Sequence, residues 1–97
     1  MGTGTSHGIP VIGCSCPVCC SDDARNNRTR ASVYVRTEDA DIIIDMSPEF
    51  RLQMLREKLS HADAILITHT HADHLHGLDD IRPMTVNKPV PVYGSPN

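Results

Sequence analysis

The sequence of 97 residues predicts an α/β domain in which helices cover a sheet. Two short aliphatic runs, DIIID and ADAILIT, have the composition of buried strands. An amphipathic segment lies between them, and a second helix-like segment follows. Because the chain is long enough for one small domain and too short for two, we expect residues 1–97 to belong to one domain.

Composition limits the class of protein. The formal net charge is −3, which argues against binding nucleic acid through bulk positive charge. No run approaches the roughly 18 apolar residues of a membrane span, and no signal peptide precedes the first glycines, so we expect a cytoplasmic protein. Aromatic residues make up only 3% of the chain, with a single Phe and no Trp, so the core must be aliphatic.

The first 30 residues are expected to be turns and loops. Residues 2–13, GTGTSHGIPVIG, do not have the spacing of a dinucleotide-binding loop. We interpret them as a tight structural turn, with a loop packed under an active site as the alternative. Residues 21–30 are polar and aperiodic; their arginines could meet a phosphate, but a solvated loop is favoured. These arginines are Arg25, Arg28 and Arg30.

Two strands and a helix are expected next. Residues 31–35, ASVYV, are β-branched enough for a strand, a turn follows over 36–39, and residues 41–45 predict a strand buried on both faces. Ser47 and Pro48 resemble an N-cap and first helical position ahead of EFRLQMLREKLS. The predicted apolar face of that helix consists of Leu52, Leu55 and Leu59.

The remaining chain predicts a strand, a short helix and another strand. Residues 62–68 form the second buried run, LHGLDDIRPM suggests a short helix stopped at Pro83, and residues 90–93 suggest a strand. Ser95 and Pro96 then announce a helix where the sequence stops. The first residues also open on a glycine turn with no strand before it. We therefore expect the chain to be part of a longer protein.

Residues 68–77, THTHADHLHG, predict a metal site. Four of the six histidines fall here, with one aspartate among them: His69, His71, Asp73, His74 and His76. On an extended loop His69 and His71 project to one side, whereas Asp73 and His74 project in a different direction, so the run can feed two metal positions with two ligands each. Imidazole and carboxylate suit zinc, manganese or iron. The alternative, an exposed histidine-rich turn, is disfavoured because the run follows a buried strand, where α/β sheets place their sites.

The other histidines are given structural roles. His76 is expected to start a helix and point away from the site, and His61 to end a helix near its negative dipole end. His7 lies in the glycine turn; it could reach a site, but a turn role is favoured.

The histidine run matches the H-x-H-x-D-H signature of the metallo-β-lactamase superfamily. The upstream stretches GTGTSHGIP, GCSCPVC and IIIDMSPEFR resemble the subgroup that includes the cyclic phosphodiesterase of phosphonate breakdown. The resemblance covers nearly all of the chain, which corresponds to about the first half of such a protein. It implies that residues 1–97 are the N-terminal portion of a four-layered αββα sandwich.

The resemblance also implies a ligand set. His69 and His71 would bind a first metal, and Asp73 and His74 a second. Two later histidines and a bridging aspartate would lie beyond Asn97. Asp45 resembles the family's buried aspartate behind the site and is not expected to be a ligand.

Such a centre predicts a hydrolase. Two divalent metals about 3.5–4 Å apart share a water, lower its pKa and present a metal-bridged hydroxide to phosphorus or carbonyl carbon. Zinc is expected, with manganese or iron as alternatives, and Asp73 is the candidate catalytic residue because it could orient that water. A small phosphodiester is the expected partner, with a homodimer left open. The 97 residues alone are expected to be inactive.

The run CSCPVCC, residues 14–20, predicts a second metal site. Cys14, Cys16 and Cys19 have a spacing that can wrap one tetrahedral zinc. By resemblance this is a structural zinc, closed by a histidine near the C-terminus. Cys20 could replace that histidine or be free. Reduced or partly disulfide-bonded cysteines and a redox role are the alternatives.

Two other functions remain open at this point. One is a thioester or lactam hydrolase on the same fold, and the other is a non-catalytic zinc-binding module built on the cysteines. Asp79 and Asp80 could support the metal ligands, but helix-terminus capping is favoured. Arg82 and Tyr93 could touch a substrate, but neither is predicted to do so.

Overall fold

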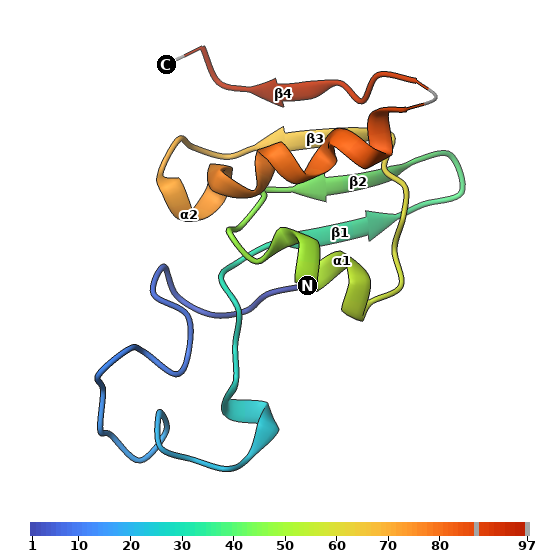
Figure 1. Cartoon of the computed structure of the whole chain (residues 1–97). Coiled ribbons are helices and arrows are strands. Elements are labelled where there is room, and N and C mark those ends of the chain that lie inside the picture. Colours follow the sequence, from blue (N-terminus) through green and yellow to red (C-terminus); the bar gives the residue numbers. More distant parts are fainter. Residues whose placement is uncertain (87, 97) are drawn as a thin grey trace.

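The computed structural model describes residues 1–86 and 88–96 and contains one four-stranded sheet. Its order is β1-β2-β3-β4, with β1 (Val33–Arg36) antiparallel to β2 (Asp41–Ile44). Strand β3 (Ala64–Ile67) runs parallel to β2, and β4 (Val92–Gly94) runs parallel to β3 (Figure 1). The parallel pairs bring the carboxyl ends of β2, β3 and β4 to the same edge.

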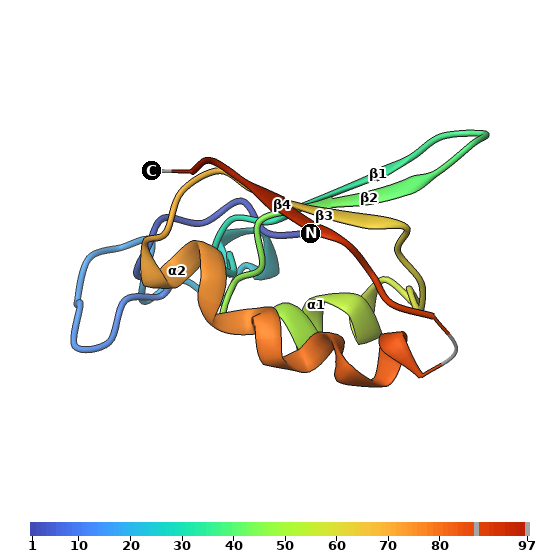
Figure 2. The same cartoon turned by 90° about the horizontal axis from the view of Figure 1, so that it is seen from above.

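The helices connect the parallel strands and lie on one side of the sheet. Helix α1 (Phe50–Arg56) joins β2 to β3, and α2 (Ala72–Leu75) continues into the 3₁₀ helix η2 (His76–Thr85) before β4. Figure 2 shows α1 and η2 together below the strands. A short 3₁₀ turn, η1 (Ala24–Asn26), precedes the sheet. The predicted α/β class and the order strand, strand, helix, strand, loop, helix, strand are confirmed.

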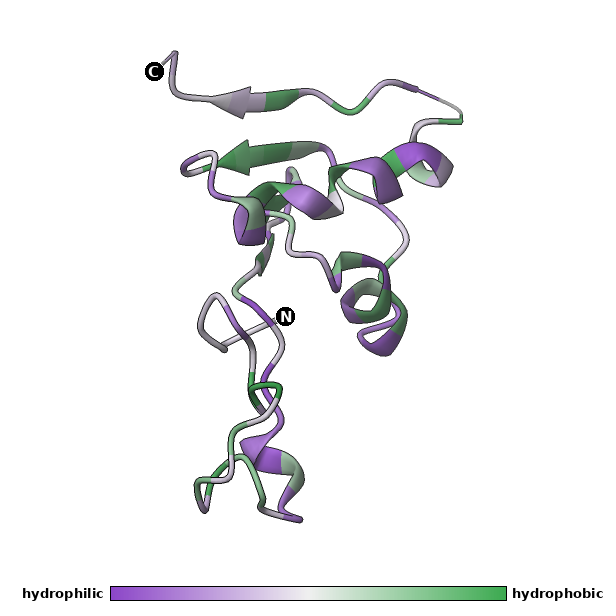
Figure 3. Ribbon diagram, turned by 60° about the vertical axis from the view of Figure 1, so that its left-hand side comes forward, coloured by the Kyte–Doolittle hydropathy of each residue, from purple (hydrophilic) through white to green (hydrophobic). Residues whose placement is uncertain are grey.

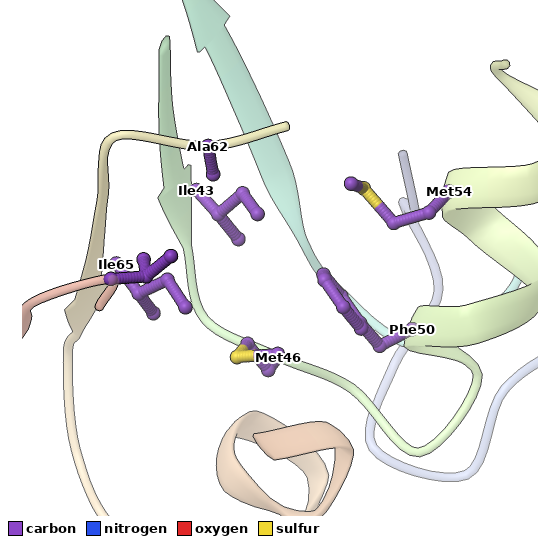
Figure 4. Close-up of a cluster of buried hydrophobic side chains, with 7 residues drawn as sticks. Ile43, Met46, Phe50, Met54, Ala62 and Ile65 are labelled. Atoms are coloured by element: carbon purple, nitrogen blue, oxygen red, sulfur yellow. The ribbon is translucent and has the colours of Figure 1, made fainter. Parts of the chain in front are cut away.

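The core lies between the sheet and the helices. Ile43 of β2 and Ile65 of β3 are fully buried and face Phe50 and Met54 of α1 (Figure 4). Met46 fills the space where the chain leaves β2. Burying each such side chain contributes roughly 1.5–3 kcal/mol. As the composition predicts, the core is aliphatic apart from the one Phe.

The opposite face of the sheet carries apolar side chains with no layer over them in the part of the chain that the structure describes. Val33 is 49% exposed, Leu66 37% and Tyr93 56%. Their register partners place these side chains on the face opposite Ile43 and Ile65. The strand predicted over residues 41–45 is confirmed as β2, but its burial on both faces is incomplete, because Ile42 and Ile44 on this face are only partly buried.

Helix α1 differs from its prediction in both its start and its buried face. It begins at Phe50, and Ser47 does not cap it; the Ser47 hydroxyl instead donates to Gln53 Oε1 at 3.0 Å. Leu52 and Leu55 are 58% and 60% exposed. The buried residues of α1 are Phe50, Gln53 and Met54, whose i, i+3, i+4 spacing places them on one side of the helix. Leu59, the third residue of the predicted face, follows the helix and packs partly buried against the core.

Two further local predictions are wrong. His61 does not end a helix, because α1 ends at Arg56; its Nε2 lies 3.1 Å from Asp63 Oδ1. The later helix is not stopped at Pro83, because η2 passes through that residue to Thr85. The strand boundaries differ from those predicted by at most two residues. The helix announced by Ser95 and Pro96 would continue through residue 97, outside the described residues.

The N-terminal segment leaves the sheet as a long loop, blue to cyan in Figure 1 and lowermost in Figure 3. Three isolated bridges, Gly2–Ser32, Gly4–Arg30 and Ile9–Arg28, hold its base against the residues that lead into β1. A Cβ on Gly4 would lie 2.6 Å from the Arg28 carbonyl oxygen, so only glycine allows this approach. Among the described residues, no helix is long and apolar enough to cross a membrane.

Candidate metal centre

The histidine run lies at the edge where the parallel strands end. Asp45 directly follows β2, Thr68 and His69 follow β3, and α2 carries Asp73 and His74. Since β2 and β3 are parallel, the residues after them meet at the same place. The sequence-predicted position of the site, at the mouth of a buried strand, matches this placement.

Asp45 is the most constrained residue of this edge. It is 5% exposed and adopts φ 62°, in the left-handed region that few non-glycine residues adopt. Its backbone N–H donates to the Leu66 carbonyl at 2.8 Å, which fixes it against β3. Its carboxylate accepts hydrogen bonds from the Thr68 backbone at 2.8 Å and the Thr68 hydroxyl at 2.6 Å. The backbone conformation thus aims a buried carboxylate into the site.

The same carboxylate orients His74. Asp45 Oδ2 lies 2.7 Å from His74 Nδ1, which leaves Nε2 facing Asp73 Oδ2 at 3.0 Å. Burial on its own raises the pKa of Asp45, but hydrogen bonds from Thr68 and His74 outweigh it and place the pKa below its usual range. An ionised Asp45 can only accept a hydrogen bond, so Nδ1–H of His74 donates to it, which is how carboxylates orient a metal-binding imidazole.

The rings form a continuous group. The His69 and His74 ring centroids are 4.1 Å apart, and those of His69 and His71 are 4.6 Å apart. Potential ligand atoms of Asp45, His69 and His74 all lie within 4.8 Å of one another. The run was expected to be an extended loop, but Asp73 and His74 are helical. They lie in the first turn of α2, which brings the His74 ring beside His69.

Backbone contacts fix α2 to the segment after β2. The Met46 N–H donates to the His74 carbonyl at 2.9 Å, and the Gly77 N–H donates to the Met46 carbonyl at 3.1 Å. Gly77 is buried, and a Cβ at this position would lie 2.1 Å from the Ser47 carbonyl oxygen. The helix that carries two candidate ligands is thus held to the segment that carries Asp45.

Two histidines outside the ring group border a hollow of about 300 Å³ beside Asp73. Its lining consists of Ser6, His7, Arg30, Pro48, Ala72, Asp73 and His76. His76, expected to point away from the site, is exposed at this border. His7, for which a turn role was favoured, also lies here, although some 65 residues separate it from Asp73. No local sequence pattern could have shown this proximity.

The other candidate ligand and substrate residues lie apart. Asp79 pairs with Arg82 through its carboxylate at 2.9 Å. Tyr93 is on the bare face of the sheet. Arg25 pairs with Asp23, and Arg28 donates to the Thr3 hydroxyl at 2.8 Å.

Three of the four cysteines converge. The sulfur atoms of Cys14, Cys16 and Cys19 all lie within 4.8 Å of one another, whereas the Cys20 thiol points to the Cys14 carbonyl oxygen at 3.9 Å. All four are free thiols. The Cys19 backbone N–H and the Cys14 thiol lower the pKa of Cys16 to about 7. Three convergent sulfurs, one of them readily ionised, fit a zinc ion.

Comparison with known proteins shows the family and supports the fold. Residues 40–97 match the family described as the beta-lactamase superfamily domain. The octanoyltransferase of Porphyromonas gingivalis (strain ATCC BAA-308 / W83) is 44% identical over 98 residues, which cover all of this chain and 20% of that protein.

Two solved structures are similar. A new diphosphatase from the PhnP family shares 47% identity with a TM-score of 0.92, over 98% of this chain and 39% of that one. Zn²⁺-bound PqqB from Methylobacterium extorquens shares 27% identity with a TM-score of 0.78, over 98% of this chain and 36% of that one. The chain therefore spans between a fifth and two fifths of the length of these relatives.

Proposed function

The chain belongs to the β-lactamase superfamily, and from this premise we propose that it supplies part of the active site of a metal-dependent phosphodiester hydrolase. The observation that carries the proposal is the Asp45–His74 pair at the edge where β2 and β3 end. A buried, ionised carboxylate on Nδ1 of a histidine whose Nε2 faces a second carboxylate is a metal-binding arrangement. The 47% identity to a protein named a diphosphatase favours phosphorus over a lactam or thioester carbonyl.

We assign His69 and His71 to one divalent cation and Asp73 and His74 to a second, most simply zinc. When bound, such a pair supplies an activated water and neutralises charge on phosphoryl oxygens. The chain's own residues contribute orientation. Thr68 holds Asp45, Asp45 holds the Nδ1 proton of His74, and Asp73 is the carboxylate that orients the attacking water. The remaining ligands are proposed to lie outside these 97 residues.

The cysteine cluster is proposed to hold a separate, structural zinc. Cys14, Cys16 and Cys19 supply three ligands, and a histidine outside these residues or Cys20 supplies the fourth. Such an ion would order a loop that contributes no residue to the core. Free thiols also suit a reducing compartment, which supports a cytoplasmic location.

The test uses the uninterrupted gene product, by which we mean the longer protein of which these 97 residues are proposed to be a part. This protein is loaded with zinc, and bis(p-nitrophenyl) phosphate is the substrate. His71→Ala is expected to reduce kcat/KM at least a hundredfold, because one candidate cation loses half of its ligands from this chain. His61→Ala is the matched control, since His61 is an exposed histidine whose imidazole pairs with Asp63. A His71→Ala protein with full activity would contradict the proposal. Faster turnover of a chromogenic β-lactam or a thioester would point to acyl chemistry instead.

A further inference from the structure

The tip of the N-terminal glycine loop lies beside the candidate metal centre. Ser6 and His7 are the central residues of a tight turn closed by the Gly8 N–H, which donates to the Thr5 carbonyl at 2.9 Å. Reciprocal backbone hydrogen bonds of 2.8 Å between Ile9 and Arg28 hold the segment that follows. Both central side chains are exposed and line the hollow that Asp73 also lines.

Arg30 fixes this turn. Its Nε donates to the Ser6 carbonyl at 2.8 Å, and its Nη1 pairs with Glu49, the residue that precedes α1. Both side chains are largely buried, at 29% and 21% exposure. Among the described residues, the second carboxylate oxygen of Glu49 is buried without a partner, so Arg30 is the only partner that the structure gives this carboxylate. The guanidinium thus links the start of α1 to the turn that presents His7.

The charges of the hollow indicate what it can bind. Glu49 balances the charge of Arg30, and Asp73 adds a carboxylate, so the residues described around this hollow offer no unbalanced arginine or lysine for a second anionic group. Ser6, His7 and His76 instead offer a hydroxyl and two imidazoles that donate and accept hydrogen bonds. The hollow therefore fits a neutral, hydrogen-bonding organic group.

We propose that Ser6 and His7 contact the polar organic group attached to the phosphorus of the substrate, and that Arg30 and Glu49 are positioning residues for that contact. The inference rests on the proposed function and extends it to the N-terminal loop. It explains why Gly4 packs directly on the backbone of residues 28–29, since that approach brings the following turn to the hollow. His7 thereby acquires a binding role in place of the turn role that its sequence context favoured.

The test compares two esters that release the same p-nitrophenolate. Bis(p-nitrophenyl) phosphate retains a group without a hydroxyl, whereas thymidine 5′-(p-nitrophenyl) phosphate retains a hydroxyl-bearing one. In the zinc-loaded, uninterrupted gene product, His7→Ala is expected to raise KM for the thymidine ester about tenfold, and to raise it for the other ester at most a third as much. Arg30→Gln should likewise raise KM for the thymidine ester more than for the other ester. Arg30→Lys should show a smaller difference between the two esters. A structural defect would lower kcat for both esters alike.

His61→Ala serves as the control and is expected to keep the parent preference, because His61 lies in the loop before β3 and pairs with Asp63. Because His7 is exposed, His7→Ala is expected to fold, so it tests the inference even if the Arg30 variants do not fold. Equal effects of His7→Ala on both esters, or none, would overturn the inference while leaving the proposed function intact. A parent protein that hydrolyses neither ester would overturn both.

Discussion

At the scale of single residues, Asp45 joins the backbone of β3 to the candidate metal centre. Both oxygens of its carboxylate are hydrogen-bonded, by Thr68 and His74, and its left-handed backbone is held by the Leu66 carbonyl. A residue with these contacts has little freedom to move. Its buried charge is stabilised only as long as those donors remain in place.

Asp45→Asn is expected to lower the zinc affinity of the histidine site about 10–100-fold, because the amide no longer attracts the Nδ1 proton of His74. Competition with a chromogenic chelator measures this. Asp39→Asn, which changes an exposed carboxyl in the β1–β2 turn, is the control. Unchanged affinity in Asp45→Asn would show that Asp45 has no part in the site.

The same residue predicts a dependence on acid. The folded pKa of Asp45 lies below its usual value, so its ionised form stabilises the fold above about pH 4, and this contribution is lost as the pH falls through the lowered pKa. The free energy of unfolding of the parent should therefore decrease more steeply with acid than that of Asp45→Asn.

The cysteines give a second prediction at this scale. In metal-free protein near pH 7, Cys16 should react with iodoacetamide before Cys20, because its lowered pKa makes the thiolate abundant. Zinc should protect Cys14, Cys16 and Cys19 while Cys20 stays reactive. Peptide mass spectrometry of alkylated protein measures all four positions. Equal protection of Cys20 would assign it to the ion as fourth ligand.

At the scale of elements, polar contacts fix α1 as much as apolar ones do. Gln53 is fully buried; its amide donates to the Thr29 hydroxyl and to the Arg30 carbonyl, both at 2.9 Å, and its oxygen accepts from Ser47. This one side chain connects α1 to the segment before β1 and to the loop after β2. The helix is only seven residues long, so these contacts supply stability that its length cannot.

Gly77→Ala tests how closely η2 packs on the segment after β2. The added methyl group would overlap the Ser47 carbonyl, so we expect a loss of about 1–3 kcal/mol in the free energy of unfolding. Zinc binding should also weaken, because the Gly77 N–H donates a hydrogen bond to the carbonyl of Met46, the residue after Asp45. Chemical denaturation measures the change. Gly94→Ala, whose Cβ would meet Ile67 at an ordinary 3.7 Å, should be nearly neutral.

The elements also show what sequence patterns could and could not predict. The aliphatic runs identify β2 and β3 because strands buried in a sheet leave a local signature. The leucine spacing misassigned the face of α1, since packing on Ile43 and Ile65 selects Phe50 and Met54 while Leu52 and Leu55 stay exposed. Likewise the histidine spacing predicted which residues gather at the candidate metal centre. The place of His7 depends on the contacts of its neighbours Ser6 and Ile9 with Arg30 and Arg28, which no local pattern contains.

At the scale of the whole molecule, the sheet has one covered and one bare face. Val33, Val35, Leu66 and Tyr93 are all more than a third exposed. In a four-layered sandwich such a face packs against a second sheet, and the described part of this chain forms one sheet. We propose that residues outside this chain cover it.

The chain of 97 residues is therefore expected to bind the dye ANS, to self-associate, and to show no measurable hydrolysis of bis(p-nitrophenyl) phosphate. The uninterrupted gene product should be monodisperse, bind little dye and be active. Light scattering, fluorescence and the hydrolysis assay compare the two. In the short chain Leu66→Lys should reduce dye binding, whereas Arg51→Lys on the helical side should not. A short chain that neither associates nor binds dye would contradict this account.

The paired backbone of Ile9 and Arg28 has a mechanical consequence. Two backbone hydrogen bonds between Ile9 and Arg28 close the base of the loop that contains the cysteines. None of the loop residues between them belongs to the core. If a protease cleaves this loop, local unfolding should not extend past the Ile9–Arg28 pair. The two resulting fragments should therefore stay associated, with His7 in its place. Local unfolding of the cysteine loop should therefore leave the strand edge, where the chemistry is proposed to occur, unchanged.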